Sequence, residues 1–185
     1  MSAVPKQRLL TAEEFAALPR EGLRTELVRG EVRAMAPAFD DHGEVAMMIG
    51  ILIGQHVLAH GLGRLYAAET GFLIARDPDT VRAPDLAFIR QERVPPRLGA
   101  PGWVREVPDL VAEVVSSGDR VAEIAEKAQM WLDAGVRVVL VVWPARRVIE
   151  VHQPDESVLT LGAGDTLEGY SVVEGLALPV AQIFG

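Results

Sequence analysis

The chain has 185 residues, about half of them hydrophobic, and a formal net charge of −8. This length and composition predict a single domain over residues 1–185, with its core at about 23–152, and argue against disorder. The sequence has no cysteine, which excludes disulfides, thiol nucleophiles and thiolate metal sites. The acidic charge counts against a non-specific nucleic-acid binder, but not against a nuclease whose acidic site recruits a metal ion.

Two segments bear on the cellular compartment. Residues 1–10 contain no apolar run followed by a small-residue cleavage site, so they do not resemble a signal peptide. The apolar stretch Val45 to Leu58 is shorter than the roughly 20 residues that span a bilayer. We therefore expect a cytoplasmic protein with no membrane partner.

Capping and periodicity signals predict the elements of the N-terminal half. These are a helix over 11–19 with a Thr11–Glu14 capping box, a β-hairpin of 23–28 and 31–35, a helix over 44–60 capped by Asp40 or Asp41, and strands over 65–68 and 72–75. The long helix is apolar almost all round, which is typical of a core or subunit-interface helix. We expect a homo-oligomer, a dimer or higher, because its apolar surface exceeds what one sheet face needs.

The C-terminal half begins with strand signals. We expect strands over 82–89 and 110–116, a helix over 120–134, a central strand over 136–143, an antiparallel pair of 148–152 and 157–161, and a loop-like tail over 167–184. The strand–helix–strand unit from 109 to 143 implies a right-handed crossover between parallel strands. The fold class predicted is α/β, with a mixed central β-sheet flanked by helices.

Glu113 is an anomaly in this pattern, because it is a lone carboxylate in the apolar strand around it. Burying an unpaired charge costs several kcal/mol. Glu113 therefore needs a partner or a bound cation, or its strand lies at a sheet edge. Asp85 follows Pro84 on another strand, and two carboxylates on neighbouring strands can hold a divalent cation such as Mg²⁺.

Lys127 is the candidate partner of these carboxylates. The helical pattern gives a core face of Val121, Ile124, Ala125, Ala128, Trp131 and Leu132. Lys127 lies roughly 40° from Trp131 on the helical wheel, at the margin of that face, so its side chain can reach over the sheet. Only two of the 18 basic residues are lysines, which makes an interior lysine more informative than usual.

An ordered set of motifs covers most of the chain. The set comprises Glu26-Leu-Val-Arg-Gly-Glu31, His42 before an apolar helix, Pro84-Asp85, Pro108-Asp-Leu-Val-Ala-Glu113-Val-Val-Ser116, Lys127 with an aromatic four residues on, and Gly135-Val before an apolar strand. This order resembles the Uma-type restriction endonuclease family, within the PD-(D/E)XK nuclease superfamily. The resemblance implies a restriction-endonuclease-like core with an N-terminal helix and β-hairpin.

The resemblance also implies a function and a site. The expected activity is Mg²⁺-dependent hydrolysis of phosphodiester bonds in DNA, with Mn²⁺ as an alternative metal. Asp85 and Glu113 would bind the metal, with the backbone carbonyl of Val114 as third ligand and Glu26 as an additional ligand, directly or through water. Lys127 would orient or activate the attacking water and stabilise the transition-state charge.

The sequence departs from the family pattern at three positions. The superfamily usually carries its lysine two residues after the glutamate, where this chain has Val115, and Lys127 matches the place to which the family has moved it. Trp143 stands where the family often has Asp, and Trp131 where it usually has Tyr. None of these changes removes an expected metal ligand.

Structural interpretations stand beside the catalytic one. Asp85 could cap a strand, Glu113 could pair with an arginine, Lys127 could be solvated, His42 could simply begin a helix, and Asp109 would lie solvated at the start of its strand. The alternative function is a catalytically idle nuclease-fold protein that acts as an assembly or binding module. A sugar hydrolase that uses the carboxylate pair is a third class, but it gives Lys127 no role.

Overall fold

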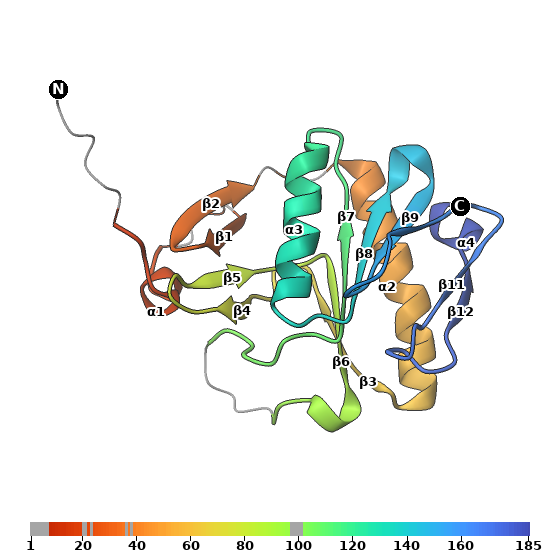
Figure 1. Ribbon diagram of the computed structural model, residues 1–185, viewed down its shortest axis with the longest axis horizontal. Helices are drawn as coiled ribbons and strands as arrows, with labels where there is room; N and C mark the ends of the chain where they lie inside the picture. Colours follow the sequence, from red (N-terminus) through yellow and green to blue (C-terminus); the bar gives the residue numbers. More distant parts are fainter. Residues whose placement is uncertain (1–7, 20–21, 23, 36, 38, 97–101) are drawn as a thin grey trace.

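The computed structural model describes residues 8–19, 22, 24–35, 37, 39–96 and 102–185 of the chain (Figure 1). Its first half contains α1 (Ala12–Ala16), β1 (Arg24–Val28), β2 (Glu31–Met35), α2 (Asp40–His60), β3 (Gly63–Ala67), β4 (Phe72–Ala75), β5 (Thr80–Arg82) and β6 (Leu86–Arg90), with a 3₁₀ turn over Gln91–Arg93. Its second half contains β7 (Leu110–Val114), α3 (Val121–Asp133), β8 (Val138–Trp143), a 3₁₀ turn over Pro144–Arg146, β9 (Val148–His152), β10 (Leu159–Leu161), β11 (Thr166–Glu168), β12 (Ala177–Pro179) and α4 (Ala181–Phe184).

The larger sheet has six strands in the order β10-β9-β8-β7-β6-β3. Strands β7 and β8 are parallel and joined through α3, while the other neighbouring pairs in this sheet are antiparallel. The predicted mixed α/β fold and the central position of β8 are therefore confirmed. Strands β7 and β8, at the centre of this sheet, consist mostly of apolar residues because core side chains cover both faces of the sheet there.

Alternation along β7 divides the core into two layers, on opposite faces of the sheet. Leu110 and Ala112 pack on the side of α2, whose residues Ile49 and Ile53 are buried against them. Val111 packs on the opposite side with Trp131 and other residues of α3. Figure 1 shows α3 on one side of the sheet and α2 with the C-terminal segment on the other. Glu113 has the parity of Val111, so its side chain points toward α3.

A second sheet, in the order β2-β1-β5-β4, lies beside the first. One of its faces packs on α1, where Leu27 and Val81 contact Ala12 and Phe15. The predicted capping box at the start of α1 is present, with Thr11 and Glu14 bonding reciprocally. The predicted strand over 82–89 is wrong in one respect. It is divided into β5 of the small sheet and β6 of the large sheet, with Ala83, Pro84 and Asp85 between them.

Helix α2 is longer than the sequence predicts. It starts at Asp40 rather than Glu44, and its N-cap is Phe39, which forms no side-chain cap, so the prediction of an aspartate cap is wrong. With 21 residues it is long and apolar enough to cross a membrane by length and composition alone, a test that core helices also pass. Its outer side exposes Met47, Ile51 and Leu58. Self-association through this side stays a prediction.

The C-terminal segment corrects the prediction of a loop-like tail. It forms the β11–β12 hairpin and α4, and it covers the α2 side of the core. Its buried residues are Leu167, Val172, Val173, Leu176, Leu178, Val180 and Ile183. Short strands with turns between them leave little periodicity in the sequence, which is why the pattern did not predict them.

Asp109 corrects another prediction, because it is completely buried rather than solvated. Its carboxylate accepts hydrogen bonds from the Arg90 backbone N–H and from the Arg90 and Arg93 side chains, at 3.0, 3.2 and 2.6 Å. The two arginines supply the positive charge that a buried carboxylate needs. This cluster ties the start of β7 to the end of β6, at the end of β7 away from Glu113.

We predict that Asp109→Asn lowers the free energy of unfolding by about 2 kcal/mol or more, because Arg90 and Arg93 lose the buried carboxylate that they share. Urea denaturation would measure the loss. Asp133→Asn is the matched control, since Asp133 is exposed and accepts one surface hydrogen bond from Gln129. Equal losses in the two variants would contradict the assignment of Asp109 as a stabilising centre.

Candidate active site

Glu113 is the centre of the candidate site. Its side chain points from β7 toward α3 and is only 7% exposed. The Lys127 ammonium donates to Glu113 Oε2 at 2.7 Å, and the Trp131 indole N–H donates to Oε1 at 2.7 Å. Burial raises the pKa of Glu113 to about 7, even though the charge of Lys127 acts in the opposite direction. The carboxylate thus has less positive charge near it than its burial demands.

Helix α3 supplies both partners of Glu113 because positions i and i+4 lie on one side of a helix. Trp131 is fully buried, whereas the Lys127 side chain is 22% exposed. The interpretation of Lys127 as a solvated residue is therefore wrong, and so is an arginine partner for Glu113. The expected core face is too wide, since Val121 and Ala125 are exposed.

Asp85 lies in the break between β5 and β6, next to the end of β7. Its Oδ2 accepts hydrogen bonds from the Val114 backbone N–H at 2.8 Å and from His42 Nε2 at 3.2 Å. Burial would raise the pKa of Asp85, but these two hydrogen bonds hold it below its ordinary value. Asp85 therefore stays ionised, with its carboxylate next to the backbone of Val114.

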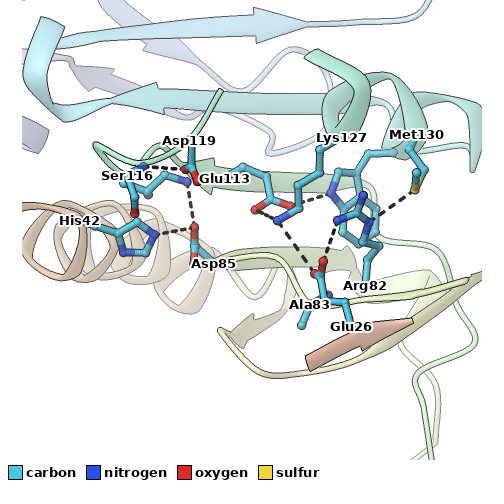
Figure 2. Close-up of polar contacts among 12 residues, drawn as sticks. Glu26, His42, Arg82, Ala83, Asp85, Glu113, Ser116, Asp119, Lys127 and Met130 are labelled. Carbon is cyan, nitrogen blue, oxygen red and sulfur yellow. Dashed lines mark hydrogen bonds and ion pairs between the residues drawn. The ribbon is translucent and has the colours of Figure 1, made fainter. Parts of the chain in front are cut away.

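His42 does more than begin a helix, because its imidazole is buried against Asp85. The hydrogen bond to Asp85 raises the pKa of His42, while burial and the nearby charge of Arg24 oppose that rise. Figure 2 shows His42, Asp85, Glu113 and Lys127 in one row that continues to Glu26 and Arg82.

Glu26 closes the other end of this row. Its Oε2 accepts a hydrogen bond from Arg82 at 2.6 Å, and its Oε1 accepts one from the Ala83 backbone N–H at 2.9 Å. Lys127 Nζ is 3.9 Å from Glu26 Oε1, so the ammonium lies between two carboxylates. Glu26 is 2% exposed and both of its oxygens are occupied by protein donors.

The donor set fits a hard divalent cation in part. Among the described residues, no three His, Asp or Glu side chains form a metal-binding group. Mg²⁺ is commonly held by only one or two carboxylates, with water and substrate oxygens as its remaining ligands. Asp85 and Glu113 can supply those two carboxylates. A carboxylate oxygen that accepts one hydrogen bond keeps a further lone pair for a metal ion, and the other oxygen of the same group can also bind the metal where it is free. A backbone N–H and C=O of one strand residue point to the same side, which turns the Val114 carbonyl toward Asp85.

Sequence reasoning brought together Asp85, Glu113 and Lys127 but missed two of their partners. The helical pattern correctly predicts Trp131 as a core residue, but a helical wheel does not distinguish a packed indole from one that also donates a hydrogen bond. The available signal was its spacing of four residues from Lys127. The hydrogen bond of His42 joins residues 43 positions apart, and no local pattern predicts such a contact.

We predict that Trp131→Phe lowers the free energy of unfolding by about 1–3 kcal/mol, because it leaves a buried carboxylate oxygen without its donor. Trp143→Phe is the matched control. The Trp143 indole N–H is buried without an acceptor in the part of the chain that the structure describes. Its removal should cost less stability in the same urea titration, and a larger loss for Trp143→Phe would contradict the role of the Trp131 donor.

Comparison with solved structures supports the fold. The chain resembles a crystal structure described as "a putative nuclease belonging to DUF820 from Anabaena variabilis ATCC 29413", with a TM-score of 0.83. The likeness covers 95% of this chain and 97% of the other at 17% sequence identity, so it shows a shared fold. No curated protein matches the sequence.

Comparison with family models shows which family the chain belongs to, whereas the structural likeness shows only the fold. The model of Uma2, described as "Putative restriction endonuclease", matches residues 12–181. The match includes Asp85, the strand that carries Glu113, the helix that carries Lys127, and most of the C-terminal segment. The chain therefore belongs to the Uma2 family of restriction-endonuclease-type proteins.

Proposed function

We propose that this protein is a Mg²⁺-dependent DNA endonuclease that hydrolyses phosphodiester bonds at Asp85, Glu113 and Lys127. One observation carries the proposal. The buried Glu113 carboxylate accepts a hydrogen bond from the Lys127 ammonium at 2.7 Å, and the Asp85 carboxylate binds the backbone N–H of the next residue, Val114. Family membership supports the reaction class, and DNA is the substrate that a restriction-endonuclease-type family suggests.

The residues would divide the work as follows. Asp85, Glu113 and the Val114 carbonyl would hold Mg²⁺, with Mn²⁺ as a substitute. The bound metal would polarise the scissile phosphate and lower the pKa of an attacking water. Lys127 donates hydrogen bonds from an ammonium that can face both Glu113 and a substrate oxygen. It would orient the water and stabilise the negative charge of the transition state.

Glu26 takes a different role in this proposal from the one suggested by the sequence. Its oxygens are engaged by Arg82 and Ala83, and it lies 3.9 Å from the Lys127 ammonium. This arrangement suits a positioning residue. Glu26 would hold Lys127 in place and keep it protonated, since burial lowers the pKa of Lys127 and the charges of Glu113 and Glu26 raise it to above its ordinary value.

We predict that Glu113→Gln, Asp85→Asn and Lys127→Met each reduce Mg²⁺-dependent cleavage of supercoiled plasmid by about 100-fold or more. The first two remove a carboxylate that would hold the metal, and the third removes the cation that would stabilise the transition-state charge. Glu126→Gln is the matched control, since Glu126 is exposed on the same helix. Cleavage that survives equally in all four variants would come from a contaminant and would contradict the proposal.

Metal binding gives a test that does not depend on activity. We predict that calorimetric titration with Mn²⁺ detects a site in wild type and in Glu126→Gln, and that the site is lost in Asp85→Asn and Glu113→Gln. Chelation by EDTA should remove the metal and the rise in thermal stability that accompanies binding. A binding isotherm unchanged by both carboxylate substitutions would place the metal elsewhere.

A second candidate function is an idle nuclease fold that serves as a binding module. The observation that favours it is the internal neutralisation of the site, where Lys127 and Trp131 already occupy both oxygens of Glu113. The two functions separate in the same assays. An idle module neither binds Mn²⁺ at Asp85 and Glu113 nor cleaves plasmid in Mg²⁺.

A further inference from the structure

Arg24 is a basic residue on the side of the small sheet that faces the site. It lies two residues before Glu26 in β1, so the two side chains share a face of the strand. The opposite face carries Leu27, which packs against α1. Because Glu26 points to Lys127 and Arg82, this parity directs Arg24 toward the row of site residues as well.

The position of Arg24 along that row follows from the antiparallel pairing of β1 with β5. Leu27 lies opposite Val81 and Glu26 contacts Arg82 and Ala83, so going back along β1 from Glu26 to Arg24 leads toward Asp85. Arg24 therefore lies near the Asp85 end of the site, while Arg82 lies at the Glu26 end. A cation at the Asp85 end is next to the place where the proposed metal and the scissile phosphate would meet.

The donors of Arg24 are poorly used, in contrast to those of Arg82. Arg24 Nε is buried and finds no hydrogen-bond acceptor among the described residues. Within the described residues, Arg24 Nε forms an ion pair with Glu69 Oε1 at 3.5 Å, and the Glu69 side chain is 71% exposed. Arg82 donates to Glu26 at 2.6 Å and is committed to the protein interior. A buried donor without an acceptor is costly, which is a reason to expect that a ligand completes it.

We propose that Arg24 binds a phosphate of the DNA backbone beside the Asp85–Glu113 pair, and that this phosphate displaces Glu69. The inference rests on the proposed function, which supplies the substrate. The planar guanidinium presents paired donors that match two phosphate oxygens, which an ammonium does not. Glu69 holds the guanidinium by a loose contact from a solvent-exposed turn, so a phosphate can replace it at little cost.

The test is steady-state cleavage of supercoiled plasmid in Mg²⁺ by Arg24→Gln and Arg137→Gln. Arg137 is the matched control, because it is exposed and precedes β8 at the end opposite to the site. Arg24→Gln should raise KM about tenfold with a smaller change in kcat, because a charge-assisted contact to substrate is lost. The slope of log KM against log salt should fall by about one, and Arg24→Lys should recover part of the loss.

Glu69→Gln tests the exchange from the other side. Removing the competing carboxylate should lower KM, and the effect should disappear in the double variant with Arg24→Gln. Circular dichroism and thermal unfolding would establish that each variant is folded.

The outcomes separate this inference from the proposed function. If wild type cleaves, Glu113→Gln does not, and Arg24→Gln matches Arg137→Gln in KM and salt slope, only the role of Arg24 is overturned. An unchanged KM for Glu69→Gln overturns the exchange with Glu69. If wild type neither cleaves nor binds Mn²⁺, the proposed function fails and this inference fails with it.

Discussion

The structure around the candidate site depends on the compensation of one buried carboxylate. Glu113 is buried on the α3 side of the large sheet, where apolar side chains shield its carboxylate from water. An uncompensated charge there would destabilise the fold by several kcal/mol. Lys127 and Trp131 satisfy its two oxygens from successive turns of α3. The crossover helix thus stabilises the strand it covers through polar contacts as well as apolar packing.

The site also marks the place where the two sheets meet. The chain leaves β5 of the small sheet and enters β6 of the large one through Ala83, Pro84 and Asp85. Glu26 accepts from the backbone at the start of this break, and Asp85 reaches from its end to the backbone of Val114. Two carboxylates therefore fasten the break on both sides. Catalytic geometry and the orientation of the sheets would be set by the same hydrogen bonds.

Much of the fold was predictable from sequence, because long elements carry strong periodicity. The α3 crossover, the parallel β7–β8 pair and the first hairpin follow from pattern and turn signals. The approach of Lys127 to Glu113 followed from a wheel angle and the scarcity of lysine. Two kinds of sequence-based prediction failed. Short strands of the C-terminal segment have too few residues to show a period, and the burial of Asp109 depends on Arg90 and Arg93, which lie 19 and 16 residues away. The sequence shows that a residue is charged, but only the structure shows whether an oppositely charged side chain contacts it.

The position of Lys127 has a consequence for how the site is assembled. The residue two positions after Glu113 is Val115, which directly follows β7 and packs into the α3 side of the core. A lysine on the strand would have a fixed separation from the glutamate, set by the backbone. A lysine on α3 has a separation set by how the helix docks. One residue of slip along the helix axis moves its side chains by about 1.5 Å and turns them by about 100°, which breaks both contacts to Glu113 together. The two hydrogen bonds to Glu113 therefore form in only one register of α3 on the sheet. The charged site exists only while the helix is docked in that register.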